Sequence, residues 1–103
     1  MPRLIRTPAA EVDLQEIAHY IAVEQGRPQT AERVIDDLIA KCGEYAASPL
    51  VGTAAKTLGA DYRLFHFKRW VIIYRPIADG IEVMRIVDGA RDYPRFFGGA
   101  SQP

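Results

Sequence analysis

The hydrophobic pattern changes its period partway along the chain, and this change constrains the fold more than any other feature. Between residues 8 and 48, apolar side chains recur every three to four positions, as on one face of an amphipathic helix. From Tyr62 onward they alternate at every second position, as in a strand with one buried face. We therefore expect a helical half followed by a sheet half, an α+β domain of two packed layers.

The helical half divides into two helices joined by a short link. Thr7 can cap the first helix with its hydroxyl, and Pro8 suits the first helical position. Gly26 is a typical helix stop, and the pair 27–28 starts the second helix. Ser48 precedes a proline, which disfavours the helical backbone and ends the second helix. So short a link predicts an antiparallel helical hairpin.

Four segments have the composition of strands. Residues 70–75 are apolar almost throughout and rich in β-branched and aromatic side chains, so we expect them at the centre of the sheet. Residues 68–69 form a tight turn before this strand, Pro76 ends it, and residues 79–80 are a hairpin turn signal. The last three strands then form an antiparallel meander, preceded by a loop over residues 49–61. The four segments are residues 3–6, 62–67, 70–75 and 81–87.

Length and composition indicate one soluble, cytosolic domain. No apolar run approaches the roughly 20 residues of a membrane span, and the N-terminus lacks the apolar core of a signal peptide. Cys42 is the only cysteine, so we expect neither a disulfide nor a thiolate metal site. It lies on the apolar stripe of the second helix and is interpreted as a buried small hydrophobe. We predict a single domain over residues 1–97, a disordered tail over residues 98–103, and no cofactor or metal.

The balance of charge argues against a dedicated nucleic-acid binder. The 13 basic and 13 acidic residues cancel, whereas affinity for nucleic acids depends largely on neutralising phosphates. The charge is uneven, however, because residues 1–58 carry a net −2 and residues 59–103 a net +2. The sheet half can therefore hold a modest basic patch. We expect no sequence-specific DNA binding by this chain alone.

One lone charge lies inside the last strand. Arg85 is costly to bury alone, so we expect it to meet either a carboxylate such as Asp88 or Asp92, or a binding partner. Beyond it, residues 91–97 gather cationic and aromatic side chains that suit a binding surface. The acidic residues of the helices, Asp13 among them, are expected on solvated faces. By strict alternation, the residues that share the face of Arg85 are Ile81, Val83 and Val87.

Several short motifs follow one another in a fixed order from Arg3 to Phe97. They are Ala10-x2-Asp13-Leu14-x2-Ile17-x2-Tyr20-Ile21, Ala31, Pro49-x2-Gly52, Tyr62-Arg63, Val71-Ile-Ile-Tyr74-Arg75, Gly80-Ile81 and Arg85-Ile-Val-Asp-Gly-Ala-Arg-Asp92. Together they resemble the ParE branch of the RelE/ParE toxin superfamily, from bacterial type II toxin–antitoxin modules. The resemblance implies a RelE/ParE-like fold, in which the hairpin packs on the meander and a short C-terminal helix follows. Asp88 departs from the family, which often has histidine near this position.

The resemblance implies one of two activities. ParE-like members act on DNA gyrase, and RelE-like members cleave mRNA on the ribosome. Metal-free RNA cleavage needs groups that transfer protons and cations that stabilise the phosphorane. RelE-like enzymes use basic side chains on the sheet and a C-terminal tyrosine, but the matching positions here hold Phe65, Val71 and Phe97. We interpret His66 and His19 as structural or surface residues.

The resemblance therefore predicts a toxin that inhibits DNA gyrase by binding, is not an enzyme, and has no catalytic residues. The alternatives are a RelE-like ribosome-dependent mRNA endoribonuclease and a non-toxic homologue that only binds a partner. The expected partner is a ParD-like antitoxin, encoded adjacently, whose acidic segment folds on binding to form a hetero-oligomer. The predicted partner-binding residues are Arg63, Arg85, Arg91, Arg95, Phe96 and Phe97.

Overall fold

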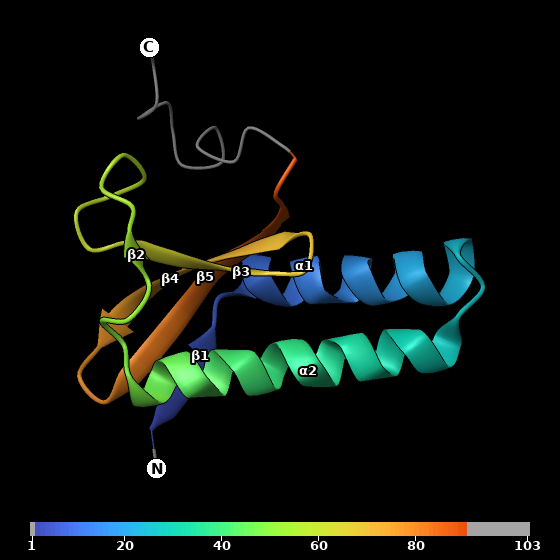
Figure 1. Cartoon of the computed structure of the whole chain (residues 1–103), viewed down its shortest axis with the longest axis horizontal. Coiled ribbons are helices and arrows are strands. Elements are labelled where there is room, and N and C mark those ends of the chain that lie inside the picture. The colour runs from blue at the N-terminus through green and yellow to red at the C-terminus, as the bar shows by residue number, and fades with distance from the viewer. Residues whose placement is uncertain (1, 91–103) are drawn as a thin grey trace.

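The computed structural model describes residues 2–90, and Figure 1 shows their arrangement. The predicted C-terminal helix and tail lie outside these residues, as do Arg91, Arg95, Phe96 and Phe97. The elements in chain order are β1 (Arg3–Arg6), α1 (Pro8–His19), the π-helix η1 (Tyr20–Glu24), α2 (Pro28–Ala47), β2 (Thr53–Ala54), β3 (Arg63–Phe67), β4 (Trp70–Ile77) and β5 (Gly80–Asp88).

The helical hairpin is confirmed and packs against one face of the sheet (Figure 1). The Thr7 hydroxyl accepts a hydrogen bond from the Ala10 backbone N–H at 3.1 Å, as expected of a helix cap. After His19 the chain continues as the π-helix η1 and then turns at Gly26, whose φ is +66°. Glycine adopts this left-handed conformation without the strain that a Cβ atom would add.

The sheet has five strands in the order β1-β5-β4-β3-β2. The antiparallel meander of β3, β4 and β5 is confirmed, with β4 at the centre. Two features extend it beyond the prediction: β1 pairs with β5 in parallel, and β2 pairs with β3 inside the segment that was expected to be a loop. None of the helices within residues 2–90 is long and apolar enough to cross a membrane.

The hairpin between β4 and β5 corrects two expectations. Pro76 does not end its strand, because β4 runs on to Ile77. It lies beyond the pairing with β3, where β4 has a neighbour on one side only, and proline is tolerated at such positions. Gly80 belongs to β5, and a Cβ atom there would lie 1.8 Å from the carbonyl oxygen of Arg3. Glycine is therefore required at this position because β1 approaches so closely.

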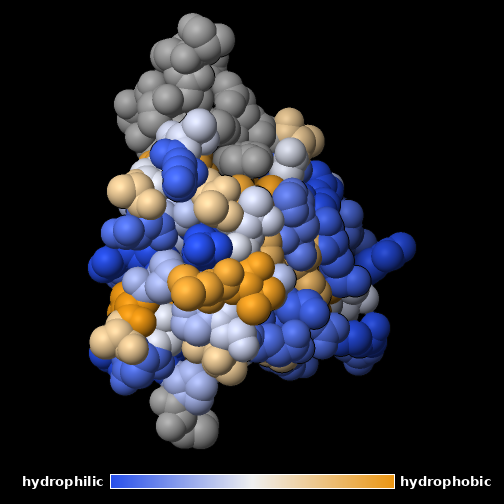
Figure 2. Space-filling view, turned by 60° about the vertical axis from the view of Figure 1, so that its left-hand side comes forward, coloured by the Kyte–Doolittle hydropathy of each residue, from blue (hydrophilic) through white to orange (hydrophobic). Residues whose placement is uncertain are grey.

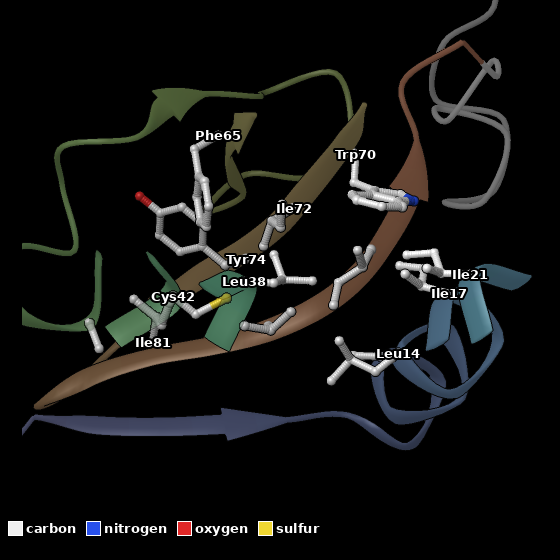
Figure 3. Close-up of a cluster of buried hydrophobic side chains, with 14 of the residues drawn as sticks. Leu14, Ile17, Ile21, Leu38, Cys42, Phe65, Trp70, Ile72, Tyr74 and Ile81 are labelled. Atoms are coloured by element: carbon white, nitrogen blue, oxygen red, sulfur yellow. The ribbon is translucent and has the colours of Figure 1, made fainter. Parts of the chain in front are cut away.

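Two hydrophobic cores lie on opposite faces of the sheet. The larger core lies between the helices and the sheet, and Figure 3 shows Leu38, Cys42 and Tyr74 within it. On the other face, Ala55 and Leu58 from the β2–β3 loop cover side chains of the central strands. The covered residues are Val71, Ile73 and Val87.

A bulge in β5 moves its side chains from one face to the other. Ile73 pairs with Arg85 but Tyr74 pairs with Val83, so β5 has one residue more than β4 at this point. Ile81 and Val83 therefore pack in the helix-side core, whereas Val87 packs in the other. The expectation that these three residues share the face of Arg85 is wrong, because strict alternation ends at the bulge.

Candidate functional site

Arg85 is paired with a carboxylate from the first helix. Its Nε and Nη2 atoms donate to the two oxygens of Asp13 at 2.8 and 3.0 Å, and the backbone N–H of Ile86 donates to Asp13 Oδ2 at 2.8 Å. Asp13 is 6% exposed, so the expectation of a solvated Asp13 is wrong. Because α1 packs against β5, this carboxylate reaches the guanidinium. The hydrogen bond to Asp13 raises the pKa of Arg85 above its ordinary value, and the charge of Glu16 adds to the effect.

The carboxylate of Asp88, an expected partner of Arg85, forms an ion pair with Arg69 instead. The turn between β3 and β4 brings Arg69 to this place, because Trp70 pairs with Asp88 across the strands. Two backbone contacts fix the end of β5, since Gly89 N–H donates to Arg69 O at 2.7 Å and Ala90 N–H donates to Asp88 Oδ1 at 2.9 Å. The hydrogen bond to Asp88 raises the pKa of Arg69.

A groove of about 470 Å³ lies between these two ion pairs. One wall is the second half of α1 with the start of η1, and the other is the Arg69 turn with the end of β5. Tyr20 stands at the rim, and the Arg69 guanidinium lies 6.0 Å from the centre of its ring. We call this feature the α1 groove. Its lining residues are Asp13, Glu16, Ile17, Tyr20, Arg69, Trp70, Arg85, Ile86, Val87 and Asp88.

Arg63 lies in a second polar cluster, which fastens the loop after α2. Its Nη1 atom donates to the carbonyl oxygens of Leu50 and Gly52 at 3.1 and 2.6 Å. The Tyr74 hydroxyl donates to Pro49 O at 2.7 Å and accepts the Gly52 N–H at 3.0 Å. We call Pro49, Gly52, Arg63 and Tyr74 the loop anchor. This cluster gives the Pro49-x2-Gly52 motif a structural reason, because a Cβ atom at Gly52 would lie 2.2 Å from the Tyr74 hydroxyl.

The loop that this anchor holds carries exposed apolar side chains. Leu50 and Val51 are 69% and 70% exposed, the highest values among the large hydrophobic residues within 2–90. Figure 2, which brings the β2 end of the sheet forward, shows a group of hydrophobic side chains surrounded by hydrophilic ones. Such patches are common at protein–protein contacts.

The structure therefore places Arg63 and Arg85 in different clusters, each bonded within the chain. Sequence reasoning missed the α1 groove. The spacing of Asp13, Glu16 and Tyr20 puts them on one face of the helix and is a signal that could have revealed one wall. The meander register, which sets Arg69 beside Asp88, could have revealed the other.

Two of the three positions compared with ribonucleases, Phe65 and Val71, are packed inside the protein, and the third, Phe97, lies outside the described residues. Phe65 is 5% exposed and its ring stacks on Tyr45 with 3.8 Å between centroids. Val71 is fully buried in the core on the other face. His19 and His66 are exposed, as expected of surface residues. Within residues 2–90, no group of three or more histidine, cysteine or acidic side chains could hold a metal ion.

The fold was compared with solved structures, and the sequence with protein-family models and curated proteins. Among solved structures, the chain is similar to one titled "Chromosomal ParDE TA system from P. aeruginosa", with a TM-score of 0.68 and 20% identity. The match covers 85% of this chain and 96% of that chain, and at this identity it shows the fold alone. A comparison with curated proteins found no match.

The sequence itself identifies the family. Residues 4–93 match the family model described as the ParE toxin of the type II toxin–antitoxin system parDE. The chain therefore belongs to the ParE toxin family, and the resemblance drawn from its short motifs is confirmed.

Proposed function

We propose that this ParE-family toxin inhibits DNA gyrase by binding it, without ribonuclease chemistry, and is neutralised by a cognate antitoxin. The observation that carries the proposal is the burial of Phe65 and Val71 in the two cores. At these positions RelE-like strands place cationic groups that stabilise the phosphorane. A lysine or arginine at Val71 would be a buried charge, which proteins tolerate only when it is paired.

The test of this proposal compares two targets side by side. Purified toxin is assayed for inhibition of supercoiling and for trapped DNA cleavage by gyrase, and in parallel for mRNA cleavage on translating ribosomes. We expect gyrase inhibition with intact RNA, and restored supercoiling when the antitoxin is added. Rapid ribosome-dependent RNA cleavage would contradict the proposal, and absence of growth arrest on expression would favour a non-toxic partner-binding homologue.

For the antitoxin interface, we propose that Arg63, Arg85, Arg91 and Arg95 line one side of it and that Phe96 and Phe97 act as apolar anchors. Arg63 and Arg85 also hold the loop anchor and the α1 groove in shape, so alanine at either position affects stability as well as binding. The double variant R91A/R95A separates these effects. We expect it to weaken binding of the adjacently encoded antitoxin and to reduce the salt dependence of binding. Unchanged affinity and salt dependence would remove these two arginines from the interface.

A further inference from the structure

We propose that the α1 groove receives a basic side chain, an arginine or lysine with apolar neighbours, from the antitoxin segment that binds this toxin. The inference rests on the proposed neutralisation by an antitoxin and adds the place and the chemistry of one contact. It is carried by the charge, the aromatic lining and the fixed walls of the groove.

The charges of the groove favour a cation. Three carboxylates and two guanidinium groups line it, and each guanidinium is hydrogen-bonded to a carboxylate, Arg85 to Asp13 and Arg69 to Asp88. The third carboxylate belongs to Glu16, which is exposed and makes no hydrogen bond or ion pair with any residue in the described range 2–90. An entering anion would find both cations already bonded and would approach Glu16. An entering cation would gain a partner.

The apolar and aromatic residues of the groove suit the methylene part of such a side chain. Trp70 and Ile17 are nearly buried and offer apolar surface to the methylene groups of an arginine or lysine. Tyr20 is 40% exposed at the rim. The Arg69 guanidinium already lies near its ring, so the ring offers an incoming side chain its remaining apolar surface.

The walls of the groove are fixed before any partner arrives. The Asp13–Arg85 pair joins α1 to β5, and the Gly89 N–H bond to Arg69 O, together with the Arg69–Asp88 pair, holds the end of β5 against the Arg69 turn. Tyr20, at the rim, is the first residue of the π-helix η1, and π-helical turns are frequent at functional sites. Because the groove is preformed, less of the binding free energy is lost in ordering its side chains.

This contact has the opposite sign to the one expected of an acidic antitoxin. The acidic segment remains the expected match for Arg91 and Arg95. The α1 groove requires that the same antitoxin also present a basic residue.

The experiment reverses one charge at two comparable places. Glu16→Lys changes the groove, and Glu24→Lys makes the same change on the exposed Glu24, which ends η1 and does not line the groove. Affinity for the purified, adjacently encoded antitoxin is measured by calorimetry at two salt concentrations. We expect Glu16→Lys to weaken binding about 10- to 100-fold and Glu24→Lys to leave it nearly unchanged.

The partner residue is then found by charge exchange. Each lysine and arginine of the antitoxin is changed to glutamate, and one of these variants should restore binding to Glu16→Lys. If Glu16→Lys also lowers the midpoint of thermal unfolding, Glu16→Gln decides the matter, because it removes the charge and keeps the size. Unchanged affinity of Glu16→Gln would then overturn the inference.

The remaining outcomes separate this inference from the proposed function. Tight binding by both wild type and Glu16→Lys would overturn the inference and leave neutralisation by the antitoxin intact. Failure of the wild type to bind would overturn both. Rescue of Glu16→Lys by Arg91→Glu or Arg95→Glu in the toxin itself would identify this chain's own C-terminal residues as the occupant and would also overturn the inference.

Discussion

Different interactions hold the structure together at the loop anchor and at the α1 groove. At the loop anchor, the fully buried Tyr74 and the guanidinium of Arg63 bond backbone groups of residues 49–52. At the α1 groove, two ion pairs do the fastening, and the Arg69 side chain is 54% exposed. The bonds to backbone groups leave few charges free, and the loop that they hold offers a partner the exposed apolar side chains of Leu50 and Val51. At the groove, Glu16 lies beside the two ion pairs and makes no hydrogen bond or ion pair within residues 2–90, so the groove is the part suited to recognition of a charge.

Removal of Asp13 should cause the largest loss of stability, because it opens the ion pair that joins α1 to β5. Asp13→Ala removes the nearly buried carboxylate to which the Arg85 guanidinium and the Ile86 N–H donate. We expect a loss of about 3–4 kcal/mol in the free energy of unfolding, measured by urea denaturation. Glu11→Ala is the control on the same helix, because Glu11 pairs with Arg6 at the surface and should contribute less than about 1 kcal/mol. A loss for Asp13→Ala as small as the loss for Glu11→Ala would mean that both pairs are surface contacts.

A methyl group at Gly52 should damage the loop anchor. Gly52→Ala places a Cβ atom 2.2 Å from a hydroxyl that is held by Pro49, so either the loop or the tyrosine must move. We expect a loss of about 2 kcal/mol, measured as a lower denaturation midpoint with an unchanged slope. Gly43→Ala is the matched control, because nothing lies within 4 Å of a Cβ atom at this helical position. The free energy of unfolding of this control should rise by about 0.5–1 kcal/mol, because alanine favours the helix more than glycine does.

If Gly52→Ala and Gly43→Ala have the same effect, the loop is not held by Tyr74. The hydrogen bonds of the buried Tyr74 would then not distinguish the loop anchor from the α1 groove.

Tyr74→Phe should lower the stability of the protein by an amount that depends on pH, because the loop anchor holds the Tyr74 hydroxyl in its protonated form. The variant loses two hydrogen bonds of the hydroxyl and should be about 1–2 kcal/mol less stable at pH 8. Burial raises the pKa of Tyr74, so the folded protein favours the protonated phenol. That contribution is present below the ordinary pKa of about 10 and is lost as the pH rises above it. The stability gap between wild type and variant should therefore narrow between pH 9 and about pH 11, measured by denaturation. A constant gap would contradict this.

The parts of the fold that follow local rules could be predicted from the sequence. Thr7, Pro8 and Gly26 delimit the first helical segment because capping and positive φ are properties of single residues. The meander was readable because alternation and turn residues act over a few positions. The parallel pairing of β1 with β5 was not, since nothing local in residues 3–6 selects a neighbour some 80 positions away.

The candidate site was harder to predict for the same reason. Asp13 and Arg85 are 72 positions apart, and their pairing depends on how α1 crosses β5. The one-residue bulge beside Arg85 has no marker in the sequence, yet it reverses which face later side chains occupy. The short motifs contain all four residues of the loop anchor, but in the α1 groove they lack Glu16, Arg69 and Trp70. They could not show that Asp13 and Arg85 form one pair, or that Gly52 and Tyr74 form one contact.

Labelling of Cys42 provides the smallest expected effect and tests whether the two regions are independent. Cys42 lies in the helix-side core with Tyr74 (Figure 3), and burial raises the pKa of its thiol to about 11. At pH 8 only about one thiol in a thousand is then a thiolate, so a thiol reagent should react only when the protein opens. Gly52→Ala, which loosens this core, should speed the labelling, and Glu16→Lys at the exposed rim should leave it unchanged. If Glu16→Lys speeds labelling as much as Gly52→Ala does, the groove is part of the same cooperative unit as the loop anchor. In that case its residues would be retained for stability and not for recognition.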